Sequence, residues 1–396
     1  MRQVAIIGVG MHPWGRFPDK TFVDMGVEAA VQALKDANIG WQKVQGMAAG
    51  IWVWGSLSGL NPGPLVASAL GETGIPIINV FTQCATGTDV VRVAHQMVAS
   101  GECDVALAVA LDKSPEGFLT YPANQLHPDM HDTDCVRWKM VGLTNPAYWA
   151  MDCRRRMEKY GTTEHHLAKA KVACSKHGAL NPRALYRKVF TEEEVLNSPM
   201  VCDPLRLYMM CAVRDGAAAA VLCSLDKAKR YTAKPVIVGA ATHGSPLYGE
   251  ASMCPGLVAA ATPGETPLIS ESWVAASKAY DEAGIGPEDI DFLEIADNSS
   301  WQYLHYPELL GFCEPGEMDR LLDEGATLIG GKLPVNCSGG LASFGEAVAA
   351  TGLAQICEIV WQLREQCGDR QVKKAKVGMG QTYGMLGNSA SIILKR

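Results

Sequence analysis

The chain has 396 residues, of which 48% are hydrophobic and 19% charged, and its formal net charge is −7. This balance excludes a disordered chain, and the length is sufficient for two core-forming units. The negative charge argues against a general nucleic-acid binder, because such proteins need an excess of Lys and Arg on one face.

Thirteen cysteines are scattered along the chain without any C-x-x-C pair, which is typical of reduced intracellular thiols. No apolar run approaches the roughly 18 residues of a membrane helix. The opening run VAIIGVG is short and favours a first strand over a signal peptide. We therefore expect a soluble, cytoplasmic protein.

Strands and helices are expected to alternate through the first half of the chain. Near-continuous apolar runs predict buried strands at 4–12, 75–81, 104–112 and 217–224. Apolar residues at helical spacing predict helices at 29–40 and from Thr86 to a Gly101 cap. This alternation predicts an α/β fold.

Three segments of the first half recur in the same order in the second half. VAIIGVGMH at 4–12 matches PVIVGAATH at 235–243, and AAVQALKDANIG at 29–40 matches AASKAYDEAGIG at 275–286. QCATGTD around Cys84 is echoed by NCSGGLA around Cys337. Shared order indicates a duplication, so we expect an N-terminal half at 1–232 and a C-terminal half at 233–396.

Between about 114 and 202 the alternation breaks, and the second half has no equivalent segment. We expect an inserted region over one face of the scaffold, where substrate contacts are common. His127 and His131 form an i,i+4 pair there, but Pro128 and the lack of a third ligand favour an exposed loop over a metal site. Arg154, Arg155 and Arg156 favour a solvated helix face over a phosphate site.

Cys84 is the strongest candidate nucleophile. It stands between the apolar run IPIINVF and the helix that begins near Thr86. The N–H groups and dipole of a helix N-terminus stabilise a thiolate. A buried structural cysteine is the usual alternative, but position and small neighbours rank Cys84 above the other twelve.

These segments also resemble the thiolase superfamily, in the branch related to the sterol-carrier-protein thiolase. QCATG resembles its nucleophile segment, and AVRDGAAAAVL at 212–222 resembles S-D-G-A-A-A-x-x-L. DFLEIADNSSWQYLHYPELLGFC at 291–313 resembles the stretch that contains H-D-C-F. VNCSGGLASFGEAVAATGLAQICE at 335–358 resembles the stretch that contains G-H-P.

The resemblance implies a thiolase-like fold of two duplicated α/β halves in five layers (αβαβα) with an inserted loop domain. It implies coenzyme A as co-substrate, with His243 and Ser245 close to the coenzyme A chain. It also implies a homodimeric core, formed along IPIINVF, and a small OB-fold subunit with a zinc ribbon. No metal site is expected in this chain.

Three catalytic positions of the family are altered. Glu346 stands in place of the G-H-P histidine, Ala296 in place of the H-D-C-F histidine, and Thr382 in place of the second cysteine. Cys84 remains, with Gly384 as an oxyanion-hole position. Burial that raises a carboxyl pKa towards 6–7 would let Glu346 accept the thiol proton. The amide of Asn298 and the phenol of Tyr383 are candidate replacements for the lost donor.

We expect an acyl-CoA C-acyltransferase that cleaves a 3-oxoacyl-CoA through a Cys84 thioester. Within the family the sequence resembles the benzoylsuccinyl-CoA thiolases of anaerobic toluene breakdown. The altered motifs and the aromatic stretches IWVWG and NPAYWA would fit a bulky aryl substrate. Two alternatives are an idle thiolase-like subunit that binds CoA esters for a partner, and a condensing enzyme that runs the reverse reaction. A retained nucleophile favours an active enzyme.

Overall fold

The computed structural model describes residues 2–52, 61–114, 144–247, 270–384 and 387–396. They form an α/β structure around a nine-stranded sheet with the order β3-β2-β4-β7-β1-β8-β11-β10-β9. The strands of this sheet are β1 (Val4–Gly15), β2 (Gly46–Ile51), β3 (Ile77–Val80), β4 (Val105–Asp112), β7 (Asp215–Ser224), β8 (Val236–Gly244), β9 (Phe292–Ile295), β10 (Val377–Gly384) and β11 (Asn388–Lys395). A separate hairpin pairs β5 (Met200–Cys202) with β6 (Leu205–Arg206).

The sheet repeats one pairing pattern on either side of its centre, where β1 and β8 pair antiparallel. Outward from β1, the pairs with β7 and then β4 are antiparallel and the pair with β2 is parallel. Outward from β8, the pairs with β11 and then β10 are antiparallel and the pair with β9 is parallel. This is the duplicated architecture that the sequence repeats predict.

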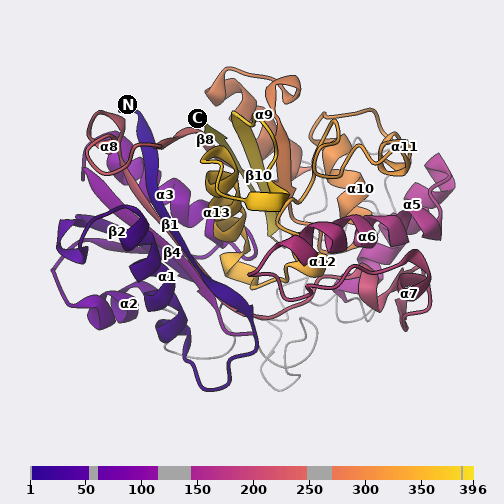
Figure 1. Cartoon of the computed structure of the whole chain (residues 1–396), viewed down its shortest axis with the longest axis horizontal. Coiled ribbons are helices and arrows are strands. Elements are labelled where there is room, and N and C mark those ends of the chain that lie inside the picture. Colours follow the sequence, from indigo (N-terminus) through magenta and orange to yellow (C-terminus); the bar gives the residue numbers. More distant parts are fainter. Residues whose placement is uncertain (1, 53–60, 115–143, 248–269, 385–386) are drawn as a thin grey trace.

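Helices separate and cover the two halves. Helix α1 (Phe22–Asp36) packs on β1 and β7, and α9 (Glu271–Ala283) packs on β8 and β11. Helices α3 (Thr86–Ser100) and α13 (Thr351–Leu363) pack against each other and against strands of both halves, and Figure 1 shows α13 at the centre of the molecule. The strands of the N-terminal half and those of the C-terminal half thus form two layers, with α3 and α13 between them and α1 and α9 outside. The order of the five layers is helix, strand, helix, strand and helix. The shorter α2 (Pro62–Leu70) packs on β2 and β3, and α8 (Leu225–Ala228) follows β7.

The central helices approach unusually closely. A Cβ built on Gly87 would lie 2.6 Å from the amide nitrogen of Leu353, and one built on Gly352 would lie 2.2 Å from Oγ1 of Thr88. Side chains at these two positions would push α3 and α13 apart. Gly87 therefore allows the close crossing of the two helices.

The described part of the inserted region packs on the C-terminal half. Its helices are α5 (Asn145–Tyr160), α6 (Glu164–Leu180) and α7 (Glu192–Leu196), and α6 contacts α10 (Ser300–Leu309), α11 (Met318–Asp323) and α12 (Gly340–Ser343). Arg156 is buried and pairs with Glu308 at 2.6 Å and Asp319 at 2.9 Å. This arginine is therefore structural, whereas Arg154 pairs at the surface with Asp203. His127 and His131 lie outside the described residues.

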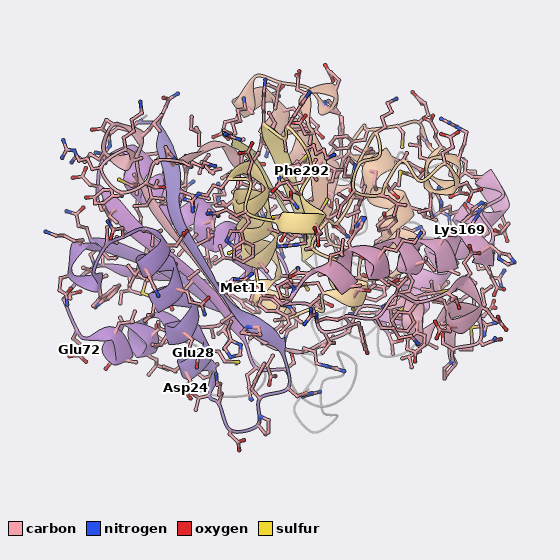
Figure 2. The ribbon with its side chains drawn as sticks, viewed as in Figure 1. Met11, Asp24, Glu28, Glu72, Lys169 and Phe292 are labelled. Atoms are coloured by element: carbon pink, nitrogen blue, oxygen red, sulfur yellow. The ribbon has the colours of Figure 1, made fainter. Side chains whose placement is uncertain are left out.

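Burial follows the layers. Figure 2 labels Met11 and Phe292, which belong to one buried cluster built from both halves, and shows Asp24, Glu28, Glu72 and Lys169 towards the edge of the molecule. A bilayer-crossing helix is absent from the described part of the chain.

One predicted helix starts later than expected. The run EAVAATGLAQICEIVWQLREQ at 346–366 has apolar residues at helical spacing and predicts a helix from Glu346, but α13 begins at Thr351. The N–H of Glu346 donates to the carbonyl of Ala212, and its carbonyl accepts from the N–H of Arg214. These bonds hold Glu346 in extended backbone beside Val213, so its side chain belongs to a loop.

Candidate active site

Cys84 lies in a tight turn between β3 and α3. The preceding residue, Gln83, has a positive φ of 56°, and Ala85 is the N-cap of α3. The N–H of Thr82 donates to Oγ1 of Thr86 over 2.9 Å, and that hydroxyl donates to the Gln83 carbonyl over 2.6 Å. The turn places Cys84, which is 8% exposed, at the N-terminus of the helix, where the dipole favours a thiolate.

Gly384 packs directly against this turn. A Cβ built on Gly384 would lie 2.5 Å from the carbonyl oxygen of Thr82 and 3.2 Å from the nitrogen of Ala85. Only a residue without a side chain fits here without displacing the Cys84 turn. The structure therefore brings Cys84 and Gly384 together.

Glu346 is fully buried on the loop before α13. Its Oε1 accepts a hydrogen bond of 2.9 Å from Nδ2 of Asn298, whereas Oε2 is buried without a hydrogen-bond partner. Burial raises the pKa of this carboxyl to about 7, against the opposing effects of the Cys211 thiol and the Asn298 amide. A carboxyl with such a pKa exchanges protons readily at neutral pH.

Asn298 is thus a partner of Glu346, and this bond occupies one of its two amide hydrogens. Ala296, which precedes it by two residues, is buried and has no polar side-chain group. The sequence-based assignment of Asn298 as the replacement oxyanion donor stays a prediction.

Cys211 is a site residue that the sequence analysis does not identify. Its thiol is buried, and burial raises its pKa well above the usual value, with further contributions from Glu346 and Cys84. The thiol therefore interacts with both the candidate base and the candidate nucleophile. Its segment, MMCAVRDG at 209–216, carries no periodic pattern that marks it as functional.

Tyr383 and Tyr306 bring phenols to the same region from β10 and α10. Burial and the nearby Tyr148 and Glu271 raise the pKa of both, and Cys84 adds to the shift at Tyr306. Both phenols are therefore hydrogen-bond donors at neutral pH. Tyr383 is a sequence-based candidate. Tyr306 was not predicted, because it stands in a run of aromatic residues that is typical of core packing.

Thr382 points elsewhere. Its hydroxyl is 3.0 Å from that of Thr88 on α3, in the buried crossing of the central helices. This pairing fits a structural role for the residue that replaces the family's second cysteine.

His243 lies behind the Cys84 turn, at the end of β8. Its Nδ1 is 2.8 Å from Oδ2 of Asp89, which also accepts a hydrogen bond of 2.7 Å from the hydroxyl of Thr82. His243, Asp89 and Thr82 therefore form a chain that ends in the turn itself. Ser245 is exposed two residues further on. Asp89 is missed by sequence reasoning, because a charged residue in a helix ordinarily faces solvent.

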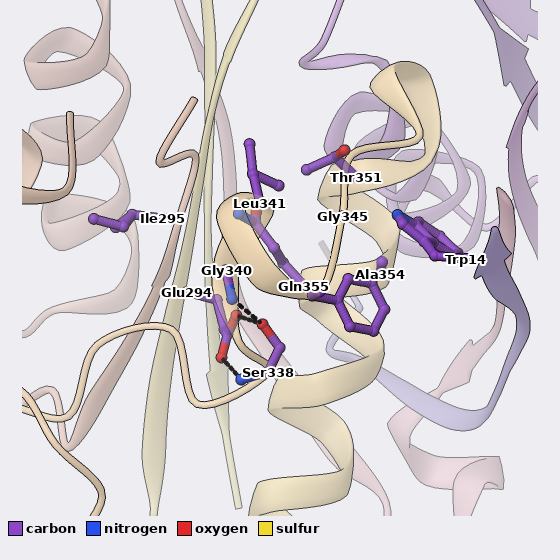
Figure 3. Close-up of a pocket in the computed structure, with 11 residues that line it drawn as sticks. Trp14, Glu294, Ile295, Ser338, Gly340, Leu341, Gly345, Thr351, Ala354 and Gln355 are labelled. Carbon is purple, nitrogen blue, oxygen red and sulfur yellow. Dashed lines mark hydrogen bonds between the residues drawn. The ribbon is translucent and has the colours of Figure 1, made fainter. Parts of the chain in front are cut away.

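A small pocket lies beside the loop that carries Glu346 (Figure 3). Trp14, Glu294, Ser338, Gly345 and Gln355 are among its lining residues, and both oxygens of Glu294 accept hydrogen bonds from Ser338. Its volume of about 10 Å³ is close to the room that one water molecule needs. Nε1 of Trp14 and Oε1 of Gln355 are buried without hydrogen-bond partners.

The described ranges contain no candidate metal-binding cluster. There, His, Cys, Asp and Glu side chains nowhere gather in a group of three suited to a metal ion.

Comparison with known proteins covers almost the whole chain. Residues 4–226 match the family model of the thiolase N-terminal domain, and residues 262–396 match that of the thiolase C-terminal domain-like family. An acetyl-CoA acetyltransferase of Methanothermobacter thermautotrophicus is 36% identical over 394 residues, 99% of each chain. The benzoylsuccinyl-CoA thiolase subunit BbsB of Thauera aromatica is 32% identical, over 97% of this chain and 95% of its own.

Two solved structures are also similar to this chain over almost its whole length. The Ltp2-ChsH2(DUF35) aldolase matches with a TM-score of 0.82 and 25% identity, over 99% of this chain and 97% of the other. Human mitochondrial 3-ketoacyl-CoA thiolase matches with a TM-score of 0.70 over 100% of this chain and 98% of its own; at 17% identity this match concerns the fold alone.

Proposed function

The chain belongs to the thiolase family and is an acyltransferase of that family, and we propose that it cleaves a 3-oxoacyl-CoA with a bulky acyl group through a thioester on Cys84. Coenzyme A is the second substrate. The sulfur of Cys84 attacks the 3-keto carbon, the bond between C2 and C3 breaks, and coenzyme A then takes the acyl group from Cys84. A covalent thioester divides one difficult step into two easier ones.

The geometry of the Cys84 turn is the observation that carries this proposal. Cys84 stands at the N-terminus of α3, and Gly384 packs against the turn without a side chain between them. Backbone N–H groups at this junction can stabilise an oxyanion on the attacked carbon. Tyr306 and Tyr383 add protonated phenols as further donors.

Glu346 is the proposed base for Cys84. Its pKa of about 7 suits proton transfer at neutral pH, and its unpaired Oε2 has capacity to accept a proton. Asn298 holds the other oxygen and so orients the carboxyl. An idle subunit has no need of such a carboxyl, which favours an active enzyme.

The acyl group is proposed to be aromatic. Trp52, Tyr148 and Trp149 belong to the same buried cluster as Cys84, and they come from the two aromatic stretches of the sequence. Aromatic side chains pack favourably against an aryl group. Together with the similarity to a benzoylsuccinyl-CoA thiolase subunit, this supports benzoylsuccinyl-CoA as the substrate and benzoyl-CoA and succinyl-CoA as products.

We also propose how the chain is divided and assembled. The mirrored strand order supports halves at 1–232 and 233–396. His243 and Ser245 are proposed to lie beside the coenzyme A chain. Strand β3 is an edge of the sheet with exposed apolar residues, which supports a homodimer along it. The structural neighbour that is named with ChsH2(DUF35) supports a small second subunit, proposed to have an OB fold and a zinc ribbon.

The test is mass spectrometry of the purified protein, with any co-purifying subunit, after exposure to benzoyl-CoA and acetyl-CoA. We expect an acyl adduct on Cys84 and thiolysis of benzoylsuccinyl-CoA. Cys84→Ser should lose both, the rate falling by several orders of magnitude as when other covalent enzymes lose their nucleophile.

The competing functions give different results. Binding of CoA esters without any adduct would indicate an idle subunit. Cleavage that persists in Cys84→Ser would indicate direct attack of coenzyme A or water on the 3-keto carbon, without a covalent intermediate on Cys84. An adduct with rapid condensation but negligible thiolysis would indicate the reverse physiological direction.

A further inference from the structure

The segment that carries Cys211 is fixed on both sides by the backbones of the candidate base and its partner. The N–H of Cys211 donates to the carbonyl of Asn298 over 2.9 Å. One residue later, the carbonyl of Ala212 accepts from the N–H of Glu346 over 2.9 Å, while its N–H donates to the carbonyl of Leu341 over 3.1 Å. The position of Cys211 relative to Glu346 and Asn298 is therefore set by main-chain bonds rather than by loose side-chain packing.

The thiol itself lies within a small buried polar group. Cys211 is 4% exposed, and Glu346 and Cys84 both lie close enough to contribute to the pKa of its thiol. Conversely, the Cys211 thiol favours the charged form of Glu346. Oε2 of Glu346 is buried without a hydrogen-bond partner, so the carboxyl has an open acceptor.

Other candidate groups near the site are engaged elsewhere. The hydroxyl of Thr382 pairs with Thr88, and the thiol of Cys174 donates to Oδ2 of Asp297 over 3.3 Å. Asn298 donates to Glu346 and carries no exchangeable acid of its own. Among the described residues, Cys211 is thus the thiol that interacts with both the nucleophile and the carboxyl.

We propose that Cys211 is a catalytic acid and base that carries a proton between the Glu346 carboxyl and C2 of the substrate. The inference rests on the proposed function, and it names the group that handles the carbon-bound proton. The family's usual second cysteine is absent, and Cys211 approaches from a different segment of the fold.

The proton transfers balance in the direction of cleavage. Glu346 accepts the proton of Cys84, whose sulfur attacks the 3-keto carbon. When the bond between C2 and C3 breaks, its electron pair stays on C2 as an enolate. Cys211 donates its thiol proton to C2, and Glu346 passes its proton to the Cys211 thiolate. The proton of Cys84 thus replaces the one given to C2, the carboxylate is restored, and no oxidant or reductant is required.

The protonation states agree with these roles. Burial keeps the Cys211 thiol protonated at neutral pH, which is the form needed to protonate an enolate. Glu346, with a pKa of about 7, populates both forms. A neutral thiol also faces an enolate without the charge repulsion that a carboxylate would impose.

The test separates acylation of Cys84 from chemistry at C2. Cys211→Ala and Cys211→Ser are prepared in the full protein, with Cys357→Ala as the matched control. Cys357 is equally buried but lies in another cluster, with its thiol near the carbonyls of Gly10 and Ala219. Acylation is measured as the adduct from benzoyl-CoA or acetyl-CoA, and chemistry at C2 as thiolysis and as hydrogen–deuterium exchange into succinyl-CoA.

We expect both Cys211 variants to keep the Cys84 adduct but to lose thiolysis and exchange by about a hundred- to ten-thousand-fold. Cys357→Ala should keep all three activities. The serine variant is included because the alanine variant could fail to fold, whereas serine nearly keeps the size of cysteine. Thermal melting of each variant tests whether it is folded.

Two results would overturn the assignment while leaving the proposed function intact. One is thiolysis by Cys211→Ala within a fewfold of the parent. The other is equal loss of adduct and thiolysis in a well-folded Cys211→Ser, which would place the thiol in acylation instead. A parent protein that forms no Cys84 adduct and cleaves no 3-oxoacyl-CoA would refute the proposed function and this inference together.

Discussion

Asn298 and Glu346 are joined by a hydrogen bond of 2.9 Å, from Nδ2 to Oε1, inside the protein. The amide orients the carboxyl and favours its charged form, while burial favours the neutral form and prevails, so that the pKa rises to about 7. The pair therefore combines a fixed geometry with a proton affinity suited to neutral pH.

The first prediction concerns the pH dependence of acylation. Because Glu346 must be ionised to accept the Cys84 proton, the single-turnover rate of acylation should rise with pH around an inflection near 7. Glu346→Gln keeps the shape and the bond to Asn298 but accepts no proton. It should lower the rate by about a hundred- to ten-thousand-fold at pH 7.

Raising the pH should partly rescue Glu346→Gln, since an unassisted thiol ionises near pH 8.5. Rapid-quench measurements of the adduct between pH 5.5 and 9.5 follow both proteins. If the glutamine variant stayed within a fewfold of the parent at every pH, Glu346 would merely fill the space of the missing histidine.

The second prediction tests the packing of Gly384 against the nucleophile turn. In Gly384→Ala the new methyl group would meet the Thr82 carbonyl at 2.5 Å, so the turn must shift. We expect a loss of about a hundred- to a thousand-fold in thiolysis, comparable to the loss of one oxyanion donor. Gly40→Ala is the control, because Gly40 has ordinary extended backbone and its Cβ would meet only the end of the Gln42 side chain. Equal activity of the two variants would contradict this role.

The duplicated strand order was predictable because each strand and helix has a local apolar pattern, and the repeats 4–12 and 235–243 copy it. The echo between Cys84 and Cys337 extends to the backbone: the preceding residues, Gln83 and Asn336, both have positive φ. Cys211 was not predictable, because it lies in an irregular segment whose neighbours come from residues far along the chain. The pattern of apolar residues in a sequence indicates local secondary structure, whereas this site is formed by contacts between distant segments of the chain.

The third prediction concerns the chain His243–Asp89–Thr82. Asp89 accepts from the Thr82 hydroxyl and pairs with His243, so it ties β8 to the nucleophile turn. Asp89→Asn keeps the size but weakens both contacts, and we expect kcat to fall roughly ten- to a hundred-fold through misplacement of Cys84. His243→Asn should raise the KM for coenzyme A, because His243 is proposed to lie beside the coenzyme A chain. Steady-state thiolysis at varied coenzyme A separates the two effects, and unchanged kcat in Asp89→Asn would refute the positioning role.

The fourth prediction concerns assembly along β3. This strand is the outer edge of the nine-stranded sheet, and Ile78 and Phe81 at its end are 42% and 52% exposed. An exposed apolar edge strand invites pairing with a second strand, because its backbone N–H and C=O groups lack partners on one side. Edge pairing with a second copy would also bring the two nucleophile turns near the interface, since Thr82 and Cys84 follow directly.

Phe81→Asp places a charge in that contact and should yield a monomer with reduced thiolysis. Light scattering measures the molar mass of the parent and of the variant. Val31→Asp is the control, because Val31 is an equally exposed apolar position on α1 and its substitution should leave the assembly unchanged. A parent that is monomeric and fully active would refute the proposed dimer.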